Sequence, residues 1–323
     1  MIMTYAEAIR DTMRQEMRKD PMVFLAGEDI SVMGGSFGCS VGLIDEFGPS
    51  RIVNTPISET AIIGMGVGAA AAGMRPIVEL MYFDFAGCAM DEIMNQAAKM
   101  RYMFGGKCTM PLVIRVAGGA TVRAAAQHSQ MIEAMFTHIP GIKVICPSTP
   151  YDAKGLLITA IEDNNPVLFV EHKALYSMKG EVEEGLKGAI PFGKAKILKE
   201  GSDITIIGWS YMSHVGMEAA EKLEEKGVSA EVIDARSLVP FDKETLIGSI
   251  RKTHRLCILQ EAVRTSGFAA EISAIVAETC IDELDENIIR ITAPDCPVPY
   301  SGVLEDAYVP SSDVVVSKVM EIF

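Results

Sequence analysis

Residues 54–83, NTPISETAIIGMGVGAAAAGMRPIVELMYF, contain one unit of the pattern that decides the fold of this chain. A polar turn leads into a helix of very small residues, and an apolar strand begins after Pro76. The strand is an almost continuous apolar run, as expected when helices cover both faces of a sheet. This order predicts a helix that packs against a parallel sheet.

The same alternation of strands and helices continues along the chain in both directions. In the first half, strands are expected at 22–26, 111–116, 142–146 and 167–171, and helices at 41–47, 91–103, from near Ser129, and at 150–162. In the second half, strands are expected at 204–208, 230–234, 256–260 and 288–291, and helices at 212–226, 242–252 and 266–279. We therefore predict an α/β fold with two doubly wound domains, 1–176 and 194–323, joined by a linker at 177–193.

The composition is that of a globular protein and disfavours several kinds of partner. The 323 residues carry a formal net charge of −14 and no Lys/Arg-rich cluster, so binding to nucleic acid or to a membrane surface is not expected. The longest near-apolar run, residues 61–74, is too short and too rich in glycine to span a bilayer. Seven cysteines without a CxxC pair indicate a reduced, cytoplasmic chain.

Glu59 is the first candidate for chemistry and stands at the start of the small-residue helix. Acids are common in a first helical turn because the helix dipole stabilises them, so a purely structural role stays open. A functional carboxyl needs apolar surroundings, and the sequence supplies Ile57, Ile62, Ile63 and Met65. Such surroundings favour the protonated carboxyl, which can share its proton with a ring nitrogen of a cofactor.

The small-residue helix has two interpretations. Glycines cost helix stability and are tolerated where another backbone comes close, which favours tight packing at an interface. Alternatively, Gly64-x-Gly66-x-x-Ala69, with Asp84 further on, matches the dinucleotide-binding fingerprint. That pattern would make the protein a NAD-dependent oxidoreductase with a Rossmann-type site at Gly64–Ala69. Only residues 61–63 are available as the preceding strand, which argues against this alternative.

His128 is the second candidate for chemistry. It follows a glycine loop, and we expect it at the N-terminus of a helix that begins near Ser129. The helix dipole would disfavour imidazolium there, which suits a residue that donates and accepts protons near neutral pH. A lone histidine more often only packs, so that role stays open. No HExxH, GxSxG or P-loop pattern occurs, so the sequence does not indicate a metalloprotease, serine hydrolase or nucleotidase.

A weaker feature is the stretch AIEDNNP at 160–166, where a helix is expected to end. Free carbonyls and the side-chain oxygens of Asp163 and Asn165 are ligands that hard cations prefer. A polar turn before proline explains the same residues without a ligand.

Taken together, a series of segments resembles the E1 beta subunits of 2-oxo acid and acetoin dehydrogenase complexes. They run in order along nearly the whole chain: Gly27-Glu28-Asp29, TPISE (55–59), GMRPIVE (73–79), NQAAK (95–99), AAQHS (125–129), PSTPYDAKGLL (147–157), DNNPV (163–167), GKA (193–195), 231–240 and PVPY (297–300). This resemblance favours functional roles for Glu59 and His128 over the structural ones.

The resemblance implies a role for each site residue. The first domain would be the pyrimidine-binding domain of a thiamine diphosphate enzyme, and the second a transketolase C-terminal-like domain used mainly for assembly. Glu59 would activate the cofactor, Ile57 would lie under it, Phe85 would pack on its pyrimidine, and Glu28 would lie near the same pocket. His128 would serve the bound intermediate and the transfer to lipoamide.

The resemblance also implies ions and partners. A potassium site in some members corresponds here to Leu112, Ala160, Ile161, Asp163 and Asn165. The Gly-Asp-Gly motif that holds Mg²⁺ and the diphosphate does not occur in this chain. We therefore expect an alpha subunit to hold Mg²⁺, in a heterotetramer of two alpha and two beta subunits with a beta–beta contact.

The implied function is an E1 dehydrogenase that cleaves a C–C bond of acetoin, pyruvate or another 2-oxo acid. The acyl group would pass to lipoamide on an E2 acyltransferase. Cys88 stands where pyruvate-type members tend to carry glutamine, and residues 101–106 and 171–176 look more like acetoin-type members. The remaining alternatives are the NAD-dependent oxidoreductase and an E1-like scaffold without activity, and intact Glu59 and His128 argue against the scaffold.

Overall fold

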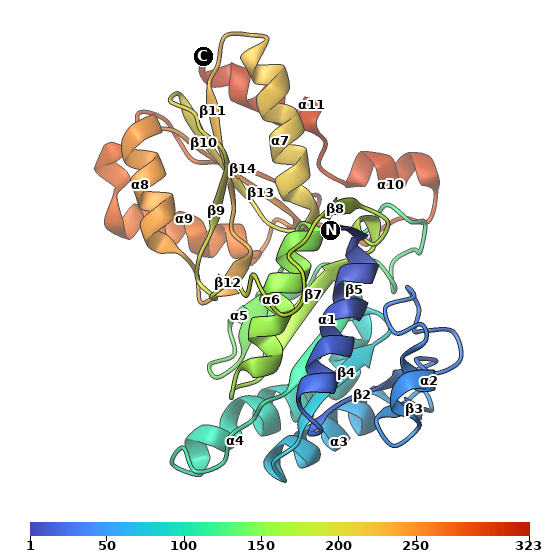
Figure 1. Ribbon diagram of the computed structural model, residues 1–323. Coiled ribbons are helices and arrows are strands. Elements are labelled where there is room, and N and C mark those ends of the chain that lie inside the picture. Colours follow the sequence, from blue (N-terminus) through green and yellow to red (C-terminus); the bar gives the residue numbers. More distant parts are fainter.

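The computed structural model describes residues 1–323 and confirms an α/β fold built on two main sheets (Figure 1). The larger sheet has the strand order β12-β6-β7-β5-β4-β2-β3, and the smaller has the order β14-β13-β10-β11-β9. The strands of the larger sheet are β2 (Val23–Glu28), β3 (Ile52–Thr55), β4 (Arg75–Leu80), β5 (Val113–Gly118), β6 (Lys143–Ile145), β7 (Val167–His172) and β12 (Ser237–Val239). Those of the smaller sheet are β9 (Lys196–Lys199), β10 (Ile204–Gly208), β11 (Ala230–Asp234), β13 (Leu256–Val263) and β14 (Ile289–Ala293).

The larger sheet is covered on both faces because its strands are apolar on both sides. On β4, Ile77 packs into one hydrophobic cluster and Val78 into another, as alternating side chains of a strand must. Helices α1 (Tyr5–Lys19) and α6 (Pro150–Glu162) pack together over the first cluster. The other face carries α3 (Glu59–Ala71) and α4 (Ala98–Met103) over the second cluster, whereas α2 (Leu43–Phe47), near β3, packs on the first cluster.

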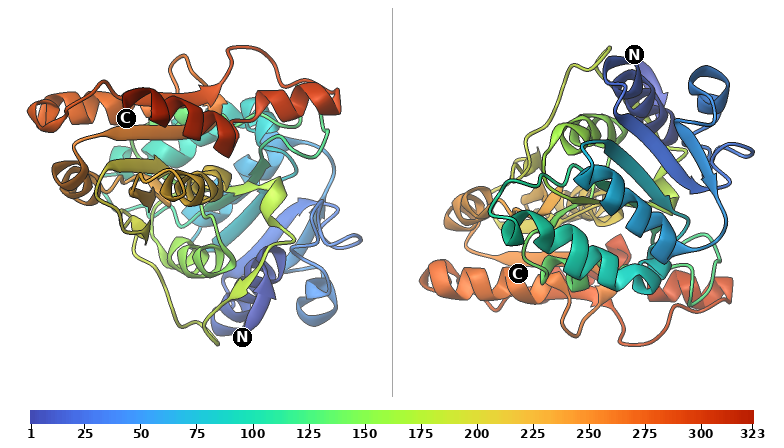
Figure 2. Two further views of the ribbon diagram at one scale, coloured as in Figure 1. Left: turned by 90° about the horizontal axis from the view of Figure 1, so that it is seen from above. Right: turned by 90° about the horizontal axis from the view of Figure 1, so that it is seen from below.

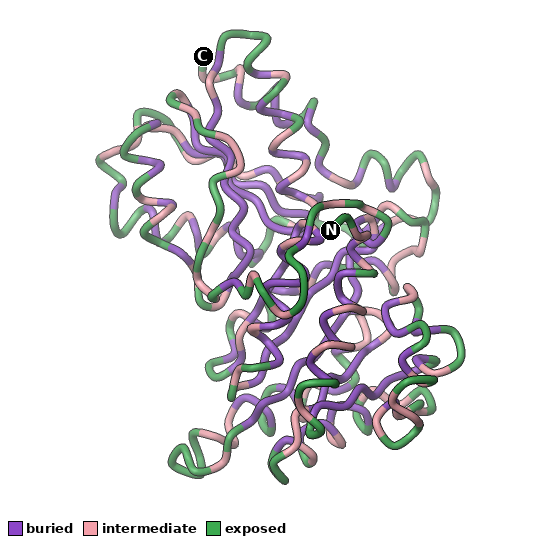
Figure 3. The backbone as a smooth tube through the Cα atoms, in the orientation of Figure 1, coloured by how far each residue is buried: buried purple, intermediate pink, exposed green.

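The two halves of the chain share one continuous core. The cluster beneath α3 extends into the C-terminal half through Trp209, Leu238 and Phe268, and Figure 3 shows buried backbone running across the junction. Strand β12 comes from the C-terminal half but pairs antiparallel with β6 of the larger sheet. The halves are thus held together by both packing and backbone hydrogen bonds.

The stretch expected to be a linker contains a strand. β8 (Lys179–Glu181) pairs antiparallel with β1 (Ile2–Thr4), which ties the N-terminus to the crossing segment. The domain limits 1–176 and 194–323 stay predictions, since the chain outside them also contributes to the packing.

The remaining helices surround the smaller sheet. They are α7 (Tyr211–Glu224), α8 (Lys243–Thr253), α9 (Phe268–Thr279) and α11 (Ser312–Val319), with the short 3-10 helices η4 (Ile281–Glu283) and η5 (Met320–Ile322). Helix α10 (Gly302–Tyr308) lies at the junction of the two halves, where Tyr308 packs with Ala120. Figure 2 shows the two chain termini on opposite sides of the molecule. No helix in the structure combines the length and the apolar character that a bilayer crossing requires.

Three predicted elements differ from the structure. The strand after Pro76 ends at Leu80, and the next residues form the 3-10 helix η1 (Phe83–Ala89). The predicted helix 91–103 begins with a π-helical segment, η2 (Glu92–Ala97), before α4. The helix expected from near Ser129 is only α5 (Glu133–Thr137). All three lie where the chain leaves the sheet, so local periodicity does not fix their conformation.

Candidate functional site

The predicted site residues gather at one edge of the larger sheet. Strands β2, β3, β4, β5 and β7 are parallel neighbours, so their carboxyl ends meet at the same edge. Glu28 ends β2, Glu59 follows β3, Phe85 follows β4 and His128 follows β5. This edge is where open α/β sheets bind ligands.

Glu59 is the first residue of α3, as the sequence predicts, but the chain alone does not enclose it. The carboxylate is only partly buried, and Ile57 beside it is 79 % exposed. Ile62 and Ile63, expected to surround the carboxyl, instead point into the core beneath the helix because they lie on its inner face. The apolar enclosure expected from the sequence is therefore absent from this chain, and a second surface would have to provide it.

Glu28 faces the same corner from the end of β2. Its side chain is buried, and its Oε1 atom has no hydrogen-bond partner. Burial raises the pKa of Glu28, and the nearby charge of Glu59 raises it further. Two carboxyl groups thus lie close together, one of them unsatisfied, at an edge that is open to solvent.

His128 lies among aromatic rings rather than at a helix N-terminus. Its ring meets Tyr82 edge to face with centroids 4.6 Å apart, and Phe85 in the same way at 5.2 Å. The helix dipole invoked from the sequence is absent, because α5 begins five residues later at Glu133. The side chain is instead oriented by aromatic contacts.

Two further polar residues of this edge are Lys173, which no sequence motif indicates, and Asp84, which the sequence indicates only as part of the dinucleotide-binding alternative. The Lys173 ammonium donates to the backbone carbonyl of His128 and, at 3.4 Å, to Ser129 Oγ, and burial lowers its pKa. Asp84 Oδ1 accepts from Gln130 Nε2 at 2.8 Å, and its other oxygen is buried without a partner. A lysine directly after a buried strand was the available signal for Lys173.

Cys88 lies next to residues 54–60, the Glu59 corner. Its thiol is exposed, and its carbonyl accepts a hydrogen bond of 2.6 Å from Thr60 Oγ1, the residue after Glu59. This contact ties η1, which carries Phe85, to the first turn of α3. Contacts therefore run from Thr60, next to Glu59, through η1 to His128.

The dinucleotide-binding alternative is wrong. Gly64, Gly66 and Ala69 lie inside α3, not in a turn between a strand and a helix, so their backbone amides are committed to the helix. A Cβ on Gly66 would come within 2.9 Å of both Leu112 and Val78. This glycine lets the helix pack closely on the sheet.

The residues expected to bind potassium lie at the opposite, amino edge of the sheet. The carbonyls of Ile161 and Asp163 accept from the Arg75 guanidinium at 2.9 and 3.2 Å, and the Lys143 ammonium pairs with the Asp163 carboxylate. Burial raises the pKa of Asp163, but hydrogen bonds from Lys143 and Asn165 lower it on balance. These two positive charges disfavour a further cation, although each carbonyl keeps a second lone pair. Potassium binding there stays a prediction.

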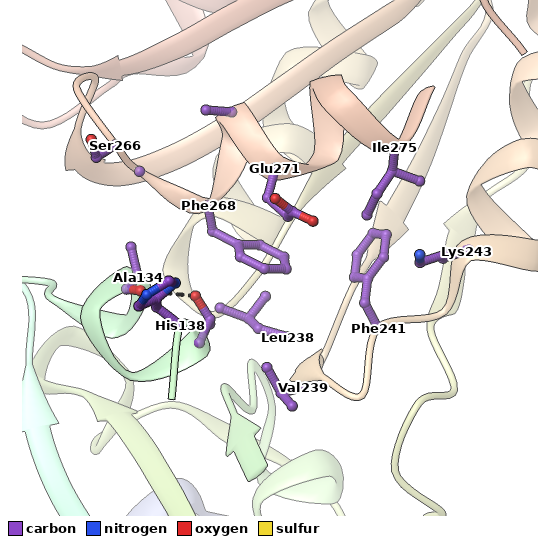
Figure 4. A pocket seen from close by; sticks show the side chains of 13 residues that line it. Ala134, His138, Leu238, Val239, Phe241, Lys243, Ser266, Phe268, Glu271 and Ile275 are labelled. Atoms are coloured by element: carbon purple, nitrogen blue, oxygen red, sulfur yellow. Dashed lines mark hydrogen bonds between the residues drawn. The ribbon is translucent and has the colours of Figure 1, made fainter. Parts of the chain in front are cut away.

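A cavity of about 590 Å³ opens elsewhere, at the junction of the two halves (Figure 4). Figure 4 shows Phe268 and Glu271 of α9 opposite Leu238 and Val239. None of the residues predicted for the site lines this cavity. The predicted titratable groups Glu28, Glu59 and His128 converge at the carboxyl edge of the larger sheet, and not at this cavity.

Comparisons with known proteins agree with the fold. Residues 2–179 match the family model of the transketolase pyrimidine-binding domain, and residues 193–315 that of the transketolase C-terminal domain. A solved structure described as a split gene transketolase, inactive beta4 tetramer, shares the fold, with a TM-score of 0.79 and 22% identity over 99% of this chain and 97% of that one.

Curated relatives cover nearly the whole chain. The acetoin:2,6-dichlorophenolindophenol oxidoreductase subunit beta of Cupriavidus necator is 50% identical over 94% of this chain and 93% of its own length, and that of Bacillus subtilis 47% over 99% and 97%. The pyruvate dehydrogenase E1 component subunit beta of Rickettsia bellii is 44% identical over 100% of this chain and 99% of its own length. The chain therefore belongs to the family of thiamine-diphosphate-dependent E1 beta subunits that includes the acetoin and pyruvate dehydrogenases.

Proposed function

We propose that this chain is the beta subunit of an acetoin-cleaving E1 enzyme. The observation that carries the proposal is the order of identities: 50% and 47% to two acetoin-oxidising beta subunits, against 44% to a pyruvate and 42% to a 2-oxoisovalerate dehydrogenase beta subunit. In the reaction a C–C bond of acetoin breaks and acetaldehyde leaves. The remaining two-carbon unit is oxidised to an acetyl group as a lipoyl disulfide is reduced, and the acetyl group ends on one of its sulfurs.

The Glu59 corner has the chemistry to hold the pyrimidine end of thiamine diphosphate. A buried, unpartnered Glu28 oxygen beside Glu59, with the exposed apolar side chain of Ile57, matches a flat heterocycle that carries polar nitrogens. Glu59 would hold a proton at a ring nitrogen, Ile57 would support the ring from below, and Phe85 would pack on it. Thiamine diphosphate, when bound, supplies the sink for the electron pair of the broken bond.

His128 would handle protons on the substrate side of the same edge. The rings of Tyr82 and Phe85 limit how far the imidazole can turn, and the Lys173 ammonium holds its backbone. An imidazole held in this way can donate and accept a proton at a fixed position. We assign it to the transfer of the acyl group to lipoamide.

An alpha subunit would complete the site. This chain has no Gly-Asp-Gly motif, so Mg²⁺ and the diphosphate would be held by the partner. Exposed apolar side chains near the site, which a partner can bury, are Val32, Met33 and Ile57, and further exposed apolar side chains of the N-terminal half are Met94, Tyr102, Met103 and Phe104. The proposed assembly has two alpha and two beta subunits with a beta–beta contact, and it serves a lipoyl-bearing E2.

Substrate preference tests the proposal directly. The chain would be purified with its alpha subunit, loaded with thiamine diphosphate and Mg²⁺, and assayed by dichlorophenolindophenol reduction with acetoin, pyruvate and 2-oxoisovalerate. We expect kcat/KM for acetoin to exceed the others by at least about tenfold, a difference of about 1.4 kcal/mol in transition-state binding. A higher kcat/KM for pyruvate would reassign the enzyme to the pyruvate dehydrogenases.

A further inference from the structure

The loop that carries His128, residues 118–130, has an unusual backbone. Gly119, Thr121, Arg123 and Ala125 all have left-handed φ angles, of 92°, 84°, 61° and 62°, and three of these residues are not glycine. Such conformations are strained for residues with a Cβ and persist only where the surroundings hold them. The contacts that hold this loop therefore bear on the position of His128.

The first contact comes from α10 of the C-terminal half, which lies beside this loop in Figure 1. Glu305 is fully buried, and its two carboxylate oxygens each accept from the backbone N–H of Arg123 at 3.2 Å. The Arg123 guanidinium pairs with Glu305 and also donates to Asp306 at 2.7 Å. One buried carboxylate thus holds both the backbone and the side chain of a strained residue.

The second contact comes from β13. Glu261 Oε1 accepts from the backbone N–H of Ala120 at 2.6 Å, and its Oε2 lies 2.6 Å from His172 Nε2. Burial raises the pKa of Glu261, but His172 and the Ala120 amide lower it on balance, so the acceptor is charged at neutral pH. A Cβ at Gly119 would come within 2.0 Å of the same His172 nitrogen, so the loop has no room to move toward β7.

The third contact closes the loop at its far end. Lys173, the residue after His172, donates to the His128 carbonyl. The C-terminal half therefore holds positions 120 and 123, while the segment that follows β7 holds position 128. These contacts span the length of the loop and leave the imidazole facing Tyr82 and Phe85.

We propose that Glu305 and Glu261 of the C-terminal half are positioning residues for His128, acting through Arg123 and Ala120 on the loop that presents the imidazole. The inference rests on the proposed role of His128. It gives the C-terminal half a part in the reaction in addition to assembly.

Glu305→Gln in the complete alpha–beta complex tests the proposal, with two readouts. The amide keeps the shape of the side chain but turns an N–H₂ group toward donors on Arg123. We expect about a tenfold slower acetylation of a lipoyl domain, with KM for the small substrate within about twofold of wild type, because misplacing a catalytic group mainly lowers kcat. Hydrogen exchange of the amides in 118–130 should be faster.

Two further variants control for folding. Glu231→Gln removes a buried carboxylate of the same half that pairs with Lys252, away from the loop, and should change neither readout. Asp306→Asn changes an exposed partner of Arg123 and does not endanger folding, and it should shift both readouts in the same direction as Glu305→Gln, by a smaller amount.

Combination with His128→Ala separates this inference from the proposed function. If Glu305 acts through His128, the double variant is no slower than His128→Ala alone. If the rate losses of the two single variants multiply in the double variant, Glu305 does not act through His128. The positioning role is also wrong if the amides of 118–130 in Glu305→Gln exchange as slowly as in Glu231→Gln. In both cases the proposed role of His128 itself stands. If His128→Ala leaves lipoyl acetylation unchanged, the proposed function of His128 is wrong and the positioning role is lost with it, whatever the loop exchange shows.

Discussion

The two ends of the proposed site, the Glu59 corner (residues 54–60) and the His128 loop (residues 118–130), differ in how much of their surroundings this chain supplies. The loop is held at Ala120, Arg123 and His128 by partners from both halves of the chain. The corner has Ile57 in solvent and Glu59 only partly covered. This chain therefore encloses the proposed proton-handling end of the site, and it leaves the proposed cofactor end open.

The largest effect is expected at the cofactor end, from Glu59→Gln. The amide is almost the same size but cannot exchange a proton with a ring nitrogen, so turnover by the alpha–beta complex should fall by about a thousandfold. Size-exclusion chromatography should show the same assembly as wild type, since the position is partly exposed and no core contact is lost. An active Glu59→Gln complex would remove the chemical basis of the corner.

A smaller effect is expected at the other end, from His128→Ala. Acetylation of the lipoyl domain should fall by about a hundredfold, more than dye-linked turnover, because the imidazole is assigned to the transfer step. Stability should change little, because the loop is held by backbone contacts that alanine keeps. Equal losses of rate in the two assays would place His128 in C–C bond cleavage instead. The two ends of the site would then not serve separate steps.

The junction of the two halves offers a test through pH. Asp234 is buried beside Asp152, and burial together with the Asp152 charge raises its pKa from 3.8 to about 7. The folded state favours the protonated carboxyl, so this contribution to stability is complete below about pH 4 and is lost as pH rises to about 7. This contribution to the stability of the junction, which also carries the contacts of the His128 loop, should therefore be smaller at pH 8 than at pH 4.

Asp234→Asn should remove that dependence. The amide oxygen can still accept from the Arg236 backbone N–H, as Asp234 Oδ1 does at 3.0 Å, and its N–H₂ group can donate to Ser148 Oγ, which now donates to Asp234 Oδ2. We expect Tm of the variant relative to wild type to rise by at least about 3 °C between pH 4 and pH 8. A difference in Tm between variant and wild type that stays constant from pH 4 to pH 8 would contradict a raised pKa of Asp234.

The same contrast explains how far the sequence predicts the structure. Strands β4, β5 and β7 are mostly apolar runs interrupted by buried charged residues such as Arg115, and local pattern alone places them within a few residues. Glu59 was correctly expected in the first turn of a helix, because a polar turn followed by small residues is itself a helix-start signal. Features that depend on residues close together in the sequence can therefore be predicted from it.

The His128 loop was not recoverable in this way. Its left-handed residues are held by Glu261 and Glu305, which lie more than 130 positions further along the chain, so no local periodicity reports them. For the same reason β12 cannot be predicted from the local sequence, because its three residues form a strand only by pairing with β6. The exposure of Ile57 could not be predicted either, because the residues proposed to bury its side chain belong to another polypeptide and not to a distant part of this one.

The smallest expected effect sharpens this last point. Ile57→Ser changes a side chain that is 79 % exposed, so the stability of the separate beta chain should change by less than about 0.5 kcal/mol. In the complex the same residue is proposed to lie under the cofactor, where loss of a buried side chain of this size should weaken thiamine diphosphate binding by about tenfold or more. Ile2→Ser, at a side chain that is 71 % exposed on β1, is the matched control and should leave cofactor affinity unchanged. Titration of thiamine diphosphate into the two apo complexes, followed by activity and by calorimetry, compares the cofactor affinities of the variants. An unaltered affinity in Ile57→Ser would mean that residues other than Ile57 close the corner. The exposure of Ile57 in this chain would then have no bearing on the cofactor.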